Sequence, residues 1–485
     1  MNLNPDTASL IAYIGYLVSI FLFVVAIKRL GKVKTARSAN QMAAGAMALA
    51  VVCTLVELGT IDYTYILIGA VLGGGIGLVL ATSVQMTAMP QLVAVFNGFG
   101  GAASTLVALS LFTAAEKGVT LAEMDFQGEA GYMTAIALVL SIIIGAVTLT
   151  GSLMAYMKLS EVFGRMFGKP ILLPLRHFLN IMLIISVLAM TVAWVATTSD
   201  PTLSVNLAIG ITVTSLVLGI LLTIPIGGAD MPVVISLLNS YSGLAASAAG
   251  FALNSNVLIV SGALVGASGL ILTQIMCKGM NRSLANVMMG GFGGEDTSGG
   301  GEKSEYVNVK SAEPEEAAMD FEDARDVIIV PGYGLAVAQG QNAIKELSDQ
   351  LKKRGCQVRY AIHPVAGRMP GHMNVLLAES NVPYDELVEM EAINNEFQKA
   401  DIALIVGAND VVNPSAKEDK SSPLYGMPVL NVEQSRMVFV IKRGLGAGFS
   451  GVKNVLFEKD NTRMIYGDAK KVLEELTTEL SESDN

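Results

Sequence analysis

Three observations predict a chain in two parts: a multi-pass α-helical membrane bundle of about nine transmembrane helices, followed by a Rossmann-like α/β domain with a parallel sheet. The 485 residues have a mean hydropathy of +0.53 and only 15% charged residues, unlike an ordinary soluble protein. Residues 1–300 hold only 12 of the 32 lysines and arginines. Beyond residue 325, apolar strands alternate with helical patterns. We therefore divide the chain into a transmembrane domain at 1–282, a flexible linker at 283–322 and an α/β domain at 323–485.

Nine apolar stretches reach the roughly 20 residues that a helix needs to cross a bilayer. The fourth is the weakest prediction because of its glycine and asparagine content. The expected spans cover residues 9–30, 41–59, 65–84, 90–112, 133–155, 177–197, 203–224, 231–252 and 256–277.

The lysines and arginines between these spans predict the orientation of the bundle. With the N-terminus outside, eleven of them fall in the inner loops and only Lys117 falls outside. An odd number of spans then places the C-terminal domain on the cytoplasmic side, where nucleotides are. The inner residues are Lys28, Arg29, Lys32, Lys34, Arg37, Lys158, Arg165, Lys169, Arg176, Lys278 and Arg282.

A motif occurs twice in the bundle. The Met-Pro pair at 89–90 is followed, after six residues, by Asn97, and the pair at 231–232 is followed in the same way by Asn239. Proline suits the first turn of a helix, so each asparagine should lie about 10 Å into the membrane. The repeat suggests two equivalent polar positions on one central path. Alternatively, both asparagines only hold helices together by hydrogen bonds.

Few ionisable residues lie in or near the expected spans. Asp230, at the inner end of the eighth span, is a candidate for proton passage or only a helix N-cap. Glu57 and His177 are expected at the membrane interface. The three cysteines have no metal-ligand or disulfide spacing, so no metal site is expected. The net charge of −10 and the lack of a basic stripe argue against nucleic acid as a partner.

The segment 290–322 is rich in glycine and then in acidic residues. It is expected to be a tether that lets the C-terminal domain move, or simply a linker without such a role. Beyond it, strands are predicted at 327–331, 357–362, 402–407, 428–432 and 437–441, and helices at 337–354, 385–399 and 467–480. This alternation predicts a parallel sheet with helices on both faces.

The segments that follow the predicted strands are rich in residues suited to a dinucleotide. Ligands of such sheets bind at the carboxyl ends of the strands, where glycines allow the backbone to approach a pyrophosphate. The third glycine of the usual fingerprint is replaced here by Val337, so this motif alone is weak. The segments are Gly332-Tyr333-Gly334, His363 to His372, Gly407-Ala408-Asn409-Asp410 and Lys442 to Phe449.

The second strand ends at Ile362-His363, without the acidic residue that usually binds the ribose 2′-hydroxyl of NAD. Together with Arg368, Lys442 and Arg443, this favours NADP(H). The last two could also be an ordinary solvated charge pair, and the histidines of this segment are expected to serve loop packing. No nucleophile–base pair or second nucleotide motif is found, so a partner must supply the other half of a redox reaction.

The chain resembles the beta subunit of the proton-translocating NAD(P) transhydrogenases over essentially its whole length. The resemblance is specific because it rests on long runs of sequence. These runs are Gly-Gly-Ala-Asp-Met-Pro-Val-Val at 227–234, Asn-Ser-Tyr-Ser-Gly at 239–243, Met-Cys-Lys at 276–278, Met-Asn-Arg-Ser at 280–283, Pro-Gly-Tyr-Gly at 331–334, His363 to Asn374 and Gly-Ala-Asn-Asp at 407–410.

The resemblance implies an oxidoreductase and translocase of a bacterial-type inner membrane. It implies NADP(H) on this chain, NAD(H) on an alpha subunit, an alpha2beta2-type assembly, and hydride transfer coupled to proton entry that drives NADPH formation. Asp230, Asn239 and Asn97 match positions linked to proton passage. The implied NADP(H) contacts are Gly332, Tyr333, Gly334, Val365, Ala366, Gly367, Arg368, Met369, Pro370, Gly407, Ala408, Asn409, Asp410, Val411, Gly426, Met427, Lys442, Arg443, Gly444, Leu445, Gly446, Ala447, Gly448, Phe449, Asp468 and Ala469.

Two positions depart from the family pattern. Gly444 stands where better-known members have a serine, which removes one hydroxyl contact to a phosphate. Asn97 stands where some members have a membrane histidine, and asparagine does not titrate near neutral pH. The group that carries the proton must therefore lie elsewhere in this chain or on the alpha subunit.

Two other functions fit parts of the sequence. A channel or secondary transporter gated by a nucleotide-sensing domain would explain a tethered Rossmann-like domain, but no selectivity filter or charged ring is found. A membrane-anchored dehydrogenase would need only one of the nine spans.

Overall fold

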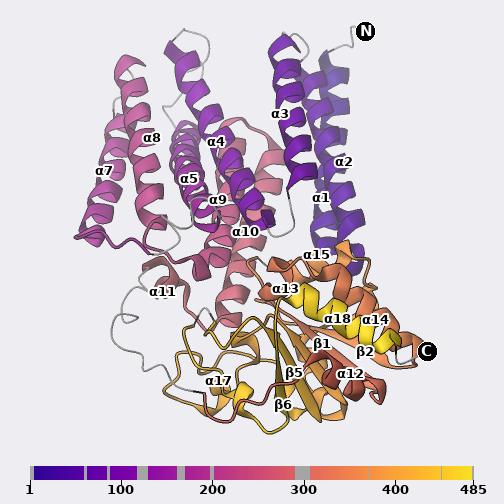
Figure 1. Cartoon of the computed structure of the whole chain (residues 1–485). Helices are drawn as coiled ribbons and strands as arrows, with labels where there is room; N and C mark the ends of the chain where they lie inside the picture. The colour runs from indigo at the N-terminus through magenta and orange to yellow at the C-terminus, as the bar shows by residue number, and fades with distance from the viewer. Residues whose placement is uncertain are drawn as a thin grey trace. The chain divides into compact units, whose positions relative to one another are not determined.

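The computed structural model describes residues 5–58, 63–84, 88–116, 129–160, 170–196, 201–289, 306–369, 371–448 and 450–482. The chain divides into two compact units, Met1–Thr273 with Met288–Gly291 and Gln274–Val287 with Phe292–Asn485. The first unit is helical, and the second contains a β-sheet (Figure 1).

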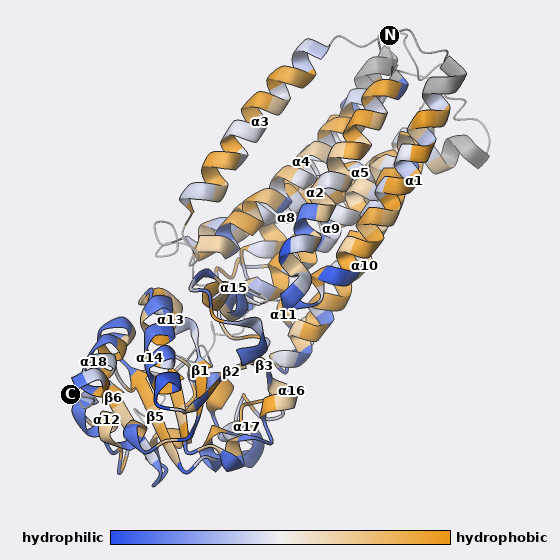
Figure 2. Cartoon of the chain, turned by 90° about the vertical axis from the view of Figure 1, so that its right-hand side faces the viewer, coloured by the Kyte–Doolittle hydropathy of each residue, from blue (hydrophilic) through white to orange (hydrophobic). Residues whose placement is uncertain are grey.

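In the part of the chain that the structure describes, nine helices are long and apolar enough to cross a membrane, which confirms the predicted number of spans. Apolar residues cover these helices, whereas in the second unit they concentrate on the strands (Figure 2). Lys117, Arg165 and Lys169, which contributed to the predicted orientation, lie outside the described residues. The helices are α1 Pro5–Leu30, α2 Val33–Leu58, α3 Tyr63–Ser83, α4 Met89–Glu116, α5 Glu129–Leu159, α7 Arg176–Ala196, α8 Pro201–Thr223, α9 Met231–Ala252 and α10 Asn256–Gly279.

Helix α9 is central in the helical unit and packs against α4 and α5. Small residues allow the close approach, as is usual between membrane helices. A Cβ on Gly101 of α4 would lie 2.5 Å from the carbonyl oxygen of Gly145 on α5. A Cβ on Gly100 would collide with Ser242 of α9. Larger side chains at these positions would push the helices apart.

Six parallel strands form one sheet in the order β3-β2-β1-β4-β5-β6, the order of the doubly wound dinucleotide-binding fold. The predicted class of the second unit is therefore confirmed. In the register of the central pair, Val327 lies opposite Ile402 and Pro331 opposite Val406. The strands are β1 Asp326–Pro331, β2 Gln357–Ile362, β3 Leu387–Glu389, β4 Ile402–Val406, β5 Met437–Lys442 and β6 Thr462–Tyr466.

The two faces of the sheet are covered differently. Helices α12 (Pro314–Glu322), α14 (Gln341–Lys353) and α18 (Ala469–Glu482) pack together on one face, where Phe321 stacks on Phe439 of β5. The other face is covered by short helices and turns, including α16 (Met390–Ile393), and their apolar side chains form one core with the strands. The described residues of the expected linker thus include a helix, α12, that packs on the domain.

Two predicted elements of this unit were wrong, and a third, the helix at 337–354, begins later than predicted. Residues 428–431 form no strand, because Pro428 lacks an N–H and the N–H of Leu430 donates to the carbonyl of Val411 in a loop. The segment 385–399 is not one helix but β3, α16 and two 3₁₀ turns. The helix predicted at 337–354 is broken at 338–340, where Gln339 has a φ of 52°, so α13 (Tyr333–Val337) precedes α14.

Two strands, β3 and β6, were not predicted. The helices α11 (Leu284–Met289), α12, α15 (His372–Glu379) and α17 (Ser415–Glu418) were not predicted either. Strand β3 has only three residues and lies at the edge of the sheet, so it carries little apolar pattern.

Candidate functional site

A cavity of about 640 Å³ opens at the carboxyl ends of β1, β4 and β5. It lies where the strand order reverses between β1 and β4, which is where ligands of this fold class bind. Its volume is within the usual range for small-molecule sites. The lining residues are Gly332, Tyr333, Gly334, Ala338, Val365, Ala366, Gly367, Gly407, Ala408, Asn409, Asp410, Val411, Ile441, Lys442, Arg443, Gly444, Gly446, Ala447, Gly448, Gly467, Asp468 and Ala469.

Glycines bring the loops after β1 and β4 together at the floor of this cavity. A Cβ on Gly332 would lie 2.4 Å from the backbone nitrogen of Ala408. Gly407 has a φ of 67°, and a Cβ there would lie 2.3 Å from the Cα of Gly334. The N–H of Gly334 donates to the carbonyl of Gly407 at 2.9 Å. Side chains at these positions would separate the two loops, so the predicted role of Gly332 and Gly334 as close-approach residues fits the geometry.

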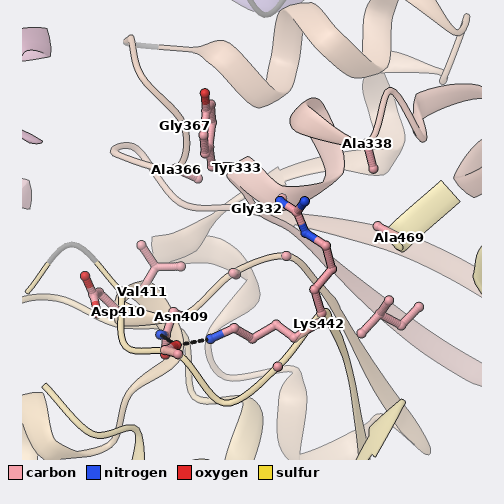
Figure 3. A pocket seen from close by; sticks show the side chains of 18 of the residues that line it. Gly332, Tyr333, Ala338, Ala366, Gly367, Asn409, Asp410, Val411, Lys442 and Ala469 are labelled. Carbon is pink, nitrogen blue, oxygen red and sulfur yellow. Dashed lines mark hydrogen bonds between the residues drawn. The ribbon is translucent and has the colours of Figure 1, made fainter. Parts of the chain in front are cut away.

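The loop after β5 places two cations at the cavity. Lys442 donates from Nζ to the carbonyl of Gly446 at 2.6 Å, and Nδ2 of Asn409 donates to the same oxygen at 3.3 Å (Figure 3). Burial lowers the pKa of Lys442, although the carboxylate of Asp410 acts in the opposite direction. Arg443, the next residue, is exposed. The loop thus carries two different cations at the cavity. The ammonium of Lys442 is half-buried and already hydrogen-bonded to Gly446, whereas the guanidinium of Arg443 is exposed.

Asp410 ties the far end of the same loop to β4. Its carboxylate accepts from the N–H of Ser450 at 3.0 Å and from the Ser450 hydroxyl at 2.8 Å. A Cβ on Gly448 would collide with this carboxylate. Asp410 therefore fixes the loop at Ser450, and its carboxylate leaves room only for glycine at position 448.

Two buried histidines shape the loop after β2. His363 shares a hydrogen bond of 2.9 Å between Nε2 and the carbonyl of Pro428, and its Nδ1 accepts from the N–H of Val365 at 3.3 Å. Nδ1 of His372 accepts from the N–H of Arg368 at 3.0 Å. Burial lowers the pKa of His363. The expectation that these histidines serve loop packing agrees with these contacts.

The same loop contacts the cavity-lining Tyr333. The guanidinium of Arg368 lies 4.4 Å from the centre of the Tyr333 ring, and the rings of Tyr333 and His372 are 6.2 Å apart. Arg368 is thus held against the wall of the cavity by a cation–π contact. This arrangement fixes the side chain of Tyr333 between two neighbours.

Of the residues expected to contact NADP(H), nineteen line this single cavity. Five described ones do not. Arg368 and Met369 lie in the loop after β2, and the partly buried Leu445 packs against the core of the sheet. Met427, which follows Gly426, packs among side chains that contact Val365 and Val411 and so supports the wall. Pro370 and Phe449 lie outside the described residues.

Three lining residues were not foreseen: Ala338, Ile441 and Gly467. Gly467 follows β6, so recognising that strand from its Thr-Arg-Met-Ile-Tyr pattern would have suggested the residue. Ile441 lies within β5, whereas site residues were expected only from Lys442 onward. Ala338 follows α13 at the break that the sequence analysis did not detect.

The donor set of the cavity fits a phosphorylated dinucleotide. Close-packed glycine backbones leave room for a pyrophosphate, and Lys442 and Arg443 provide positive charge for a further phosphate. Among the described residues, two acidic side chains line it: Asp410, whose carboxylate accepts hydrogen bonds from Ser450, and Asp468. Neither follows β2, where NAD-specific sites carry a carboxylate.

In the helical unit, both Met-Pro motifs begin a helix. Met89 is the first residue of α4 and Met231 of α9, so Asn97 and Asn239 occupy equivalent positions. Asn97 is buried, and its Nδ2 donates to the carbonyl of Ile235 on α9 at 3.2 Å. Asn239 is half-buried. This hydrogen bond fits the alternative that Asn97 holds two helices together.

Asp230 lies at the N-cap position of α9 and is 4% exposed. Its side chain makes no capping hydrogen bond to the helix. A buried carboxylate at a helix start that does not cap the helix remains a candidate for proton passage. Glu57 of α2, which was expected at the membrane interface, accepts a hydrogen bond of 2.7 Å from the hydroxyl of Tyr16 on α1.

Comparisons with known proteins gave matches that span most of the chain. Residues 12–479 match the family model described as the NAD(P) transhydrogenase beta subunit. Two curated relatives, both named NAD(P) transhydrogenase subunit beta and both from Rhodospirillum rubrum, are 48% identical over 468 residues. The alignment covers 95% of this chain and 97% of each relative.

Proposed function

Since the chain belongs to the NAD(P) transhydrogenase beta subunit family, we propose that the cavity at the carboxyl ends of β1, β4 and β5 binds NADP(H), and that NAD(H) binds to the alpha subunit. The observation that carries the assignment is the pairing of Lys442 and Arg443 at the cavity with the absence of an acidic residue after β2. A 2′-phosphate requires cations at its binding site, whereas a free 2′-hydroxyl is usually bound by a carboxylate after the second strand.

Bound NADP(H) supplies the nicotinamide that gives or takes the hydride. The residues of this chain bind and orient it, because hydride transfer needs positioning more than acid–base groups. The glycine loops after β1 and β4 allow a close approach, Tyr333 is fixed by its neighbours, and Asp410 holds the loop of Lys442. A partner with the second nucleotide is needed, in agreement with the beta subunit family.

We further propose that proton movement through the helical unit biases the affinity of this domain for NADP(H). Linkage requires that protonation and nucleotide binding affect one another equally. A proton-motive force of about 200 mV corresponds to roughly 4.6 kcal/mol per proton. That shifts an equilibrium by about three orders of magnitude. Asp230, Asn97 and Asn239 are the proposed residues of the path, with a titrating group beyond the two asparagines.

The assembly is proposed to be of the alpha2beta2 type in a bacterial-type inner membrane, with the α/β domain cytoplasmic. Positive charge on the loops that precede α2 and follow α10 supports this orientation. The domains are proposed to be 1–282, 283–322 and 323–485. Family membership disfavours the nucleotide-gated channel considered above.

Nucleotide titration of the purified full-length chain in detergent tests the cofactor assignment. We expect NADPH to bind at least about 100-fold more tightly than NADH, because one phosphate with two cations adds about 3 kcal/mol. Equal affinities for the two nucleotides would rule the assignment out.

A further inference from the structure

Asn454 is fully buried and does not line the cavity, yet its side chain controls a residue that does. It follows the loop after β5 and begins the 3₁₀ turn Val455–Glu458. Its Oδ1 accepts from the N–H of Leu456 at 3.0 Å, which is an ordinary cap. Its Nδ2 donates to the backbone oxygen of Asn409 at 3.1 Å and to Oδ1 of Asn409 at 3.0 Å.

These contacts determine the orientation of the Asn409 amide. An amide nitrogen can only donate, so the oxygen of the Asn409 side chain must face Asn454. Its NH₂ group must then face the other way, where it donates to the carbonyl of Gly446 in the cavity loop at 3.3 Å. Without Asn454, only the long hydrogen bond to the Gly446 carbonyl would hold the Asn409 amide in this orientation.

The orientation matters because the expected ligand is an anion. An NH₂ group directed into the cavity can donate to a phosphate oxygen, whereas an amide oxygen would repel it. The orientation of Asn454 itself is fixed, because its Oδ1 must accept from the buried N–H of Leu456 and its Nδ2 then points at Asn409. Buried polar groups are rarely left without a partner, so the arrangement is strongly specified.

We infer that Asn454 is a positioning residue for the NADP(H) site, which fixes the Asn409 amide so that its N–H donors face the nucleotide and the Gly446 loop. This inference rests on the proposed function of the cavity.

The test uses the full-length chain in detergent, with NADPH titrations and thermal unfolding of each variant. Asn454→Ser keeps a capping oxygen for Leu456 but removes the donor to Asn409. Asn413→Ser is the matched control. Asn413 is also fully buried, and it donates to the carbonyl of Lys453 and accepts from the N–H of Ser415, none of which lines the cavity.

We expect Asn454→Ser to weaken NADPH binding about tenfold, the effect of one hydrogen bond to a charged group. The Asn413 control, with a similar loss of melting temperature, should stay within about twofold of the unmodified chain.

A double-variant cycle separates positioning from a general loss of structure. If Asn454 acts through Asn409, adding Asn454→Ser to Asn409→Ala should weaken NADPH binding no further than Asn409→Ala alone. The inference would be overturned if the double variant lost NADPH affinity by the product of the two single-variant factors. It would also be overturned if Asn454→Ser bound NADPH with unchanged affinity. An unmodified chain that binds no NADPH would instead refute the proposed function of the cavity.

Discussion

Replacing Arg443 by alanine should weaken the binding of NADPH while leaving that of NADH nearly unchanged. Arg443 is exposed at the cavity, directly after the last residue of β5. Its neighbour Lys442 is engaged with the carbonyl of Gly446. Arg443 is therefore the cation most available to a 2′-phosphate, and a guanidinium can bind a phosphate with two parallel hydrogen bonds.

The size of the effect follows from the contacts that would be lost. A hydrogen bond to a charged group contributes about 1.5–3 kcal/mol, which corresponds to a roughly 10- to 150-fold weaker affinity. Partial compensation by Lys442 would keep the loss near the lower end, because that ammonium must first leave Gly446. NADH lacks the 2′-phosphate, so its affinity should change by less than about twofold.

Titrations of the full-length chain with both nucleotides measure this difference. Arg436→Ala provides a matched control, because Arg436 lies just before the opposite end of β5, is 66% exposed in its side chain, and has only a 3.8 Å ion pair with Asp401. The control should bind both nucleotides like the unmodified chain. If Arg443→Ala bound NADPH with unchanged affinity, or lost NADH binding equally, the assignment of this cation to the 2′-phosphate would be wrong.

Three further predictions concern the floor of the cavity, the β2 loop and the helical unit. Gly407→Ala should abolish NADPH binding and lower the melting temperature, since its Cβ would lie 2.3 Å from the Cα of Gly334 and its φ is 67°; an alanine variant with normal affinity would contradict the close packing. Burial lowers the pKa of His363 below its ordinary 6.5, so the unfolded state binds the proton more readily. The stability that this histidine contributes is present above about pH 6.5 and is lost as the pH falls below it, by at most about 1.4 kcal/mol per pH unit. The protection factors of the amides in residues 363–372, which are corrected for the slower intrinsic exchange at low pH, should therefore fall between pH 7.5 and 5.5, and His363→Asn should flatten that profile; equal profiles would remove the histidine from the account. Asn97→Leu removes the hydrogen bond to Ile235 and should cost about 0.6 kcal/mol of thermal stability in detergent. It should also reduce proton movement more than NADPH binding, and a variant with normal proton movement would show that Asn97 only joins helices.

Much of the fold could be predicted because its signals are local and strong. The nine spans follow from apolar length alone, the buried strands β1, β4 and β5 are short apolar runs, and β2 alternates polar and apolar residues before its buried end. Strand β3 was missed because its three residues read as part of a helical pattern. The segment 428–431 is buried and apolar like a strand, but its backbone is satisfied by a loop, which no local pattern indicates.

Site residues that directly follow a strand could be predicted from the sequence. Residues whose role depends on contacts with distant parts of the chain could not. The glycines after β1 and β4 and the cations after β5 line one cavity, as the positions of the strand ends imply. Leu445 has the same sequence context as its neighbours but packs against the core. Asn454 could not have been chosen from sequence, because its role depends on a hydrogen bond to Asn409, 45 positions away.

The central claim is that this chain couples hydride transfer to proton movement together with an alpha subunit. The most direct measurement uses membrane vesicles from cells that co-express both subunits. It follows the reduction of an NAD+ analogue by NADPH together with the pH inside the vesicles. The account predicts hydride transfer accompanied by a pH change, with an uncoupler abolishing only the pH change. NADPH binding without hydride transfer would contradict the account, and hydride transfer without a pH change would contradict the coupling.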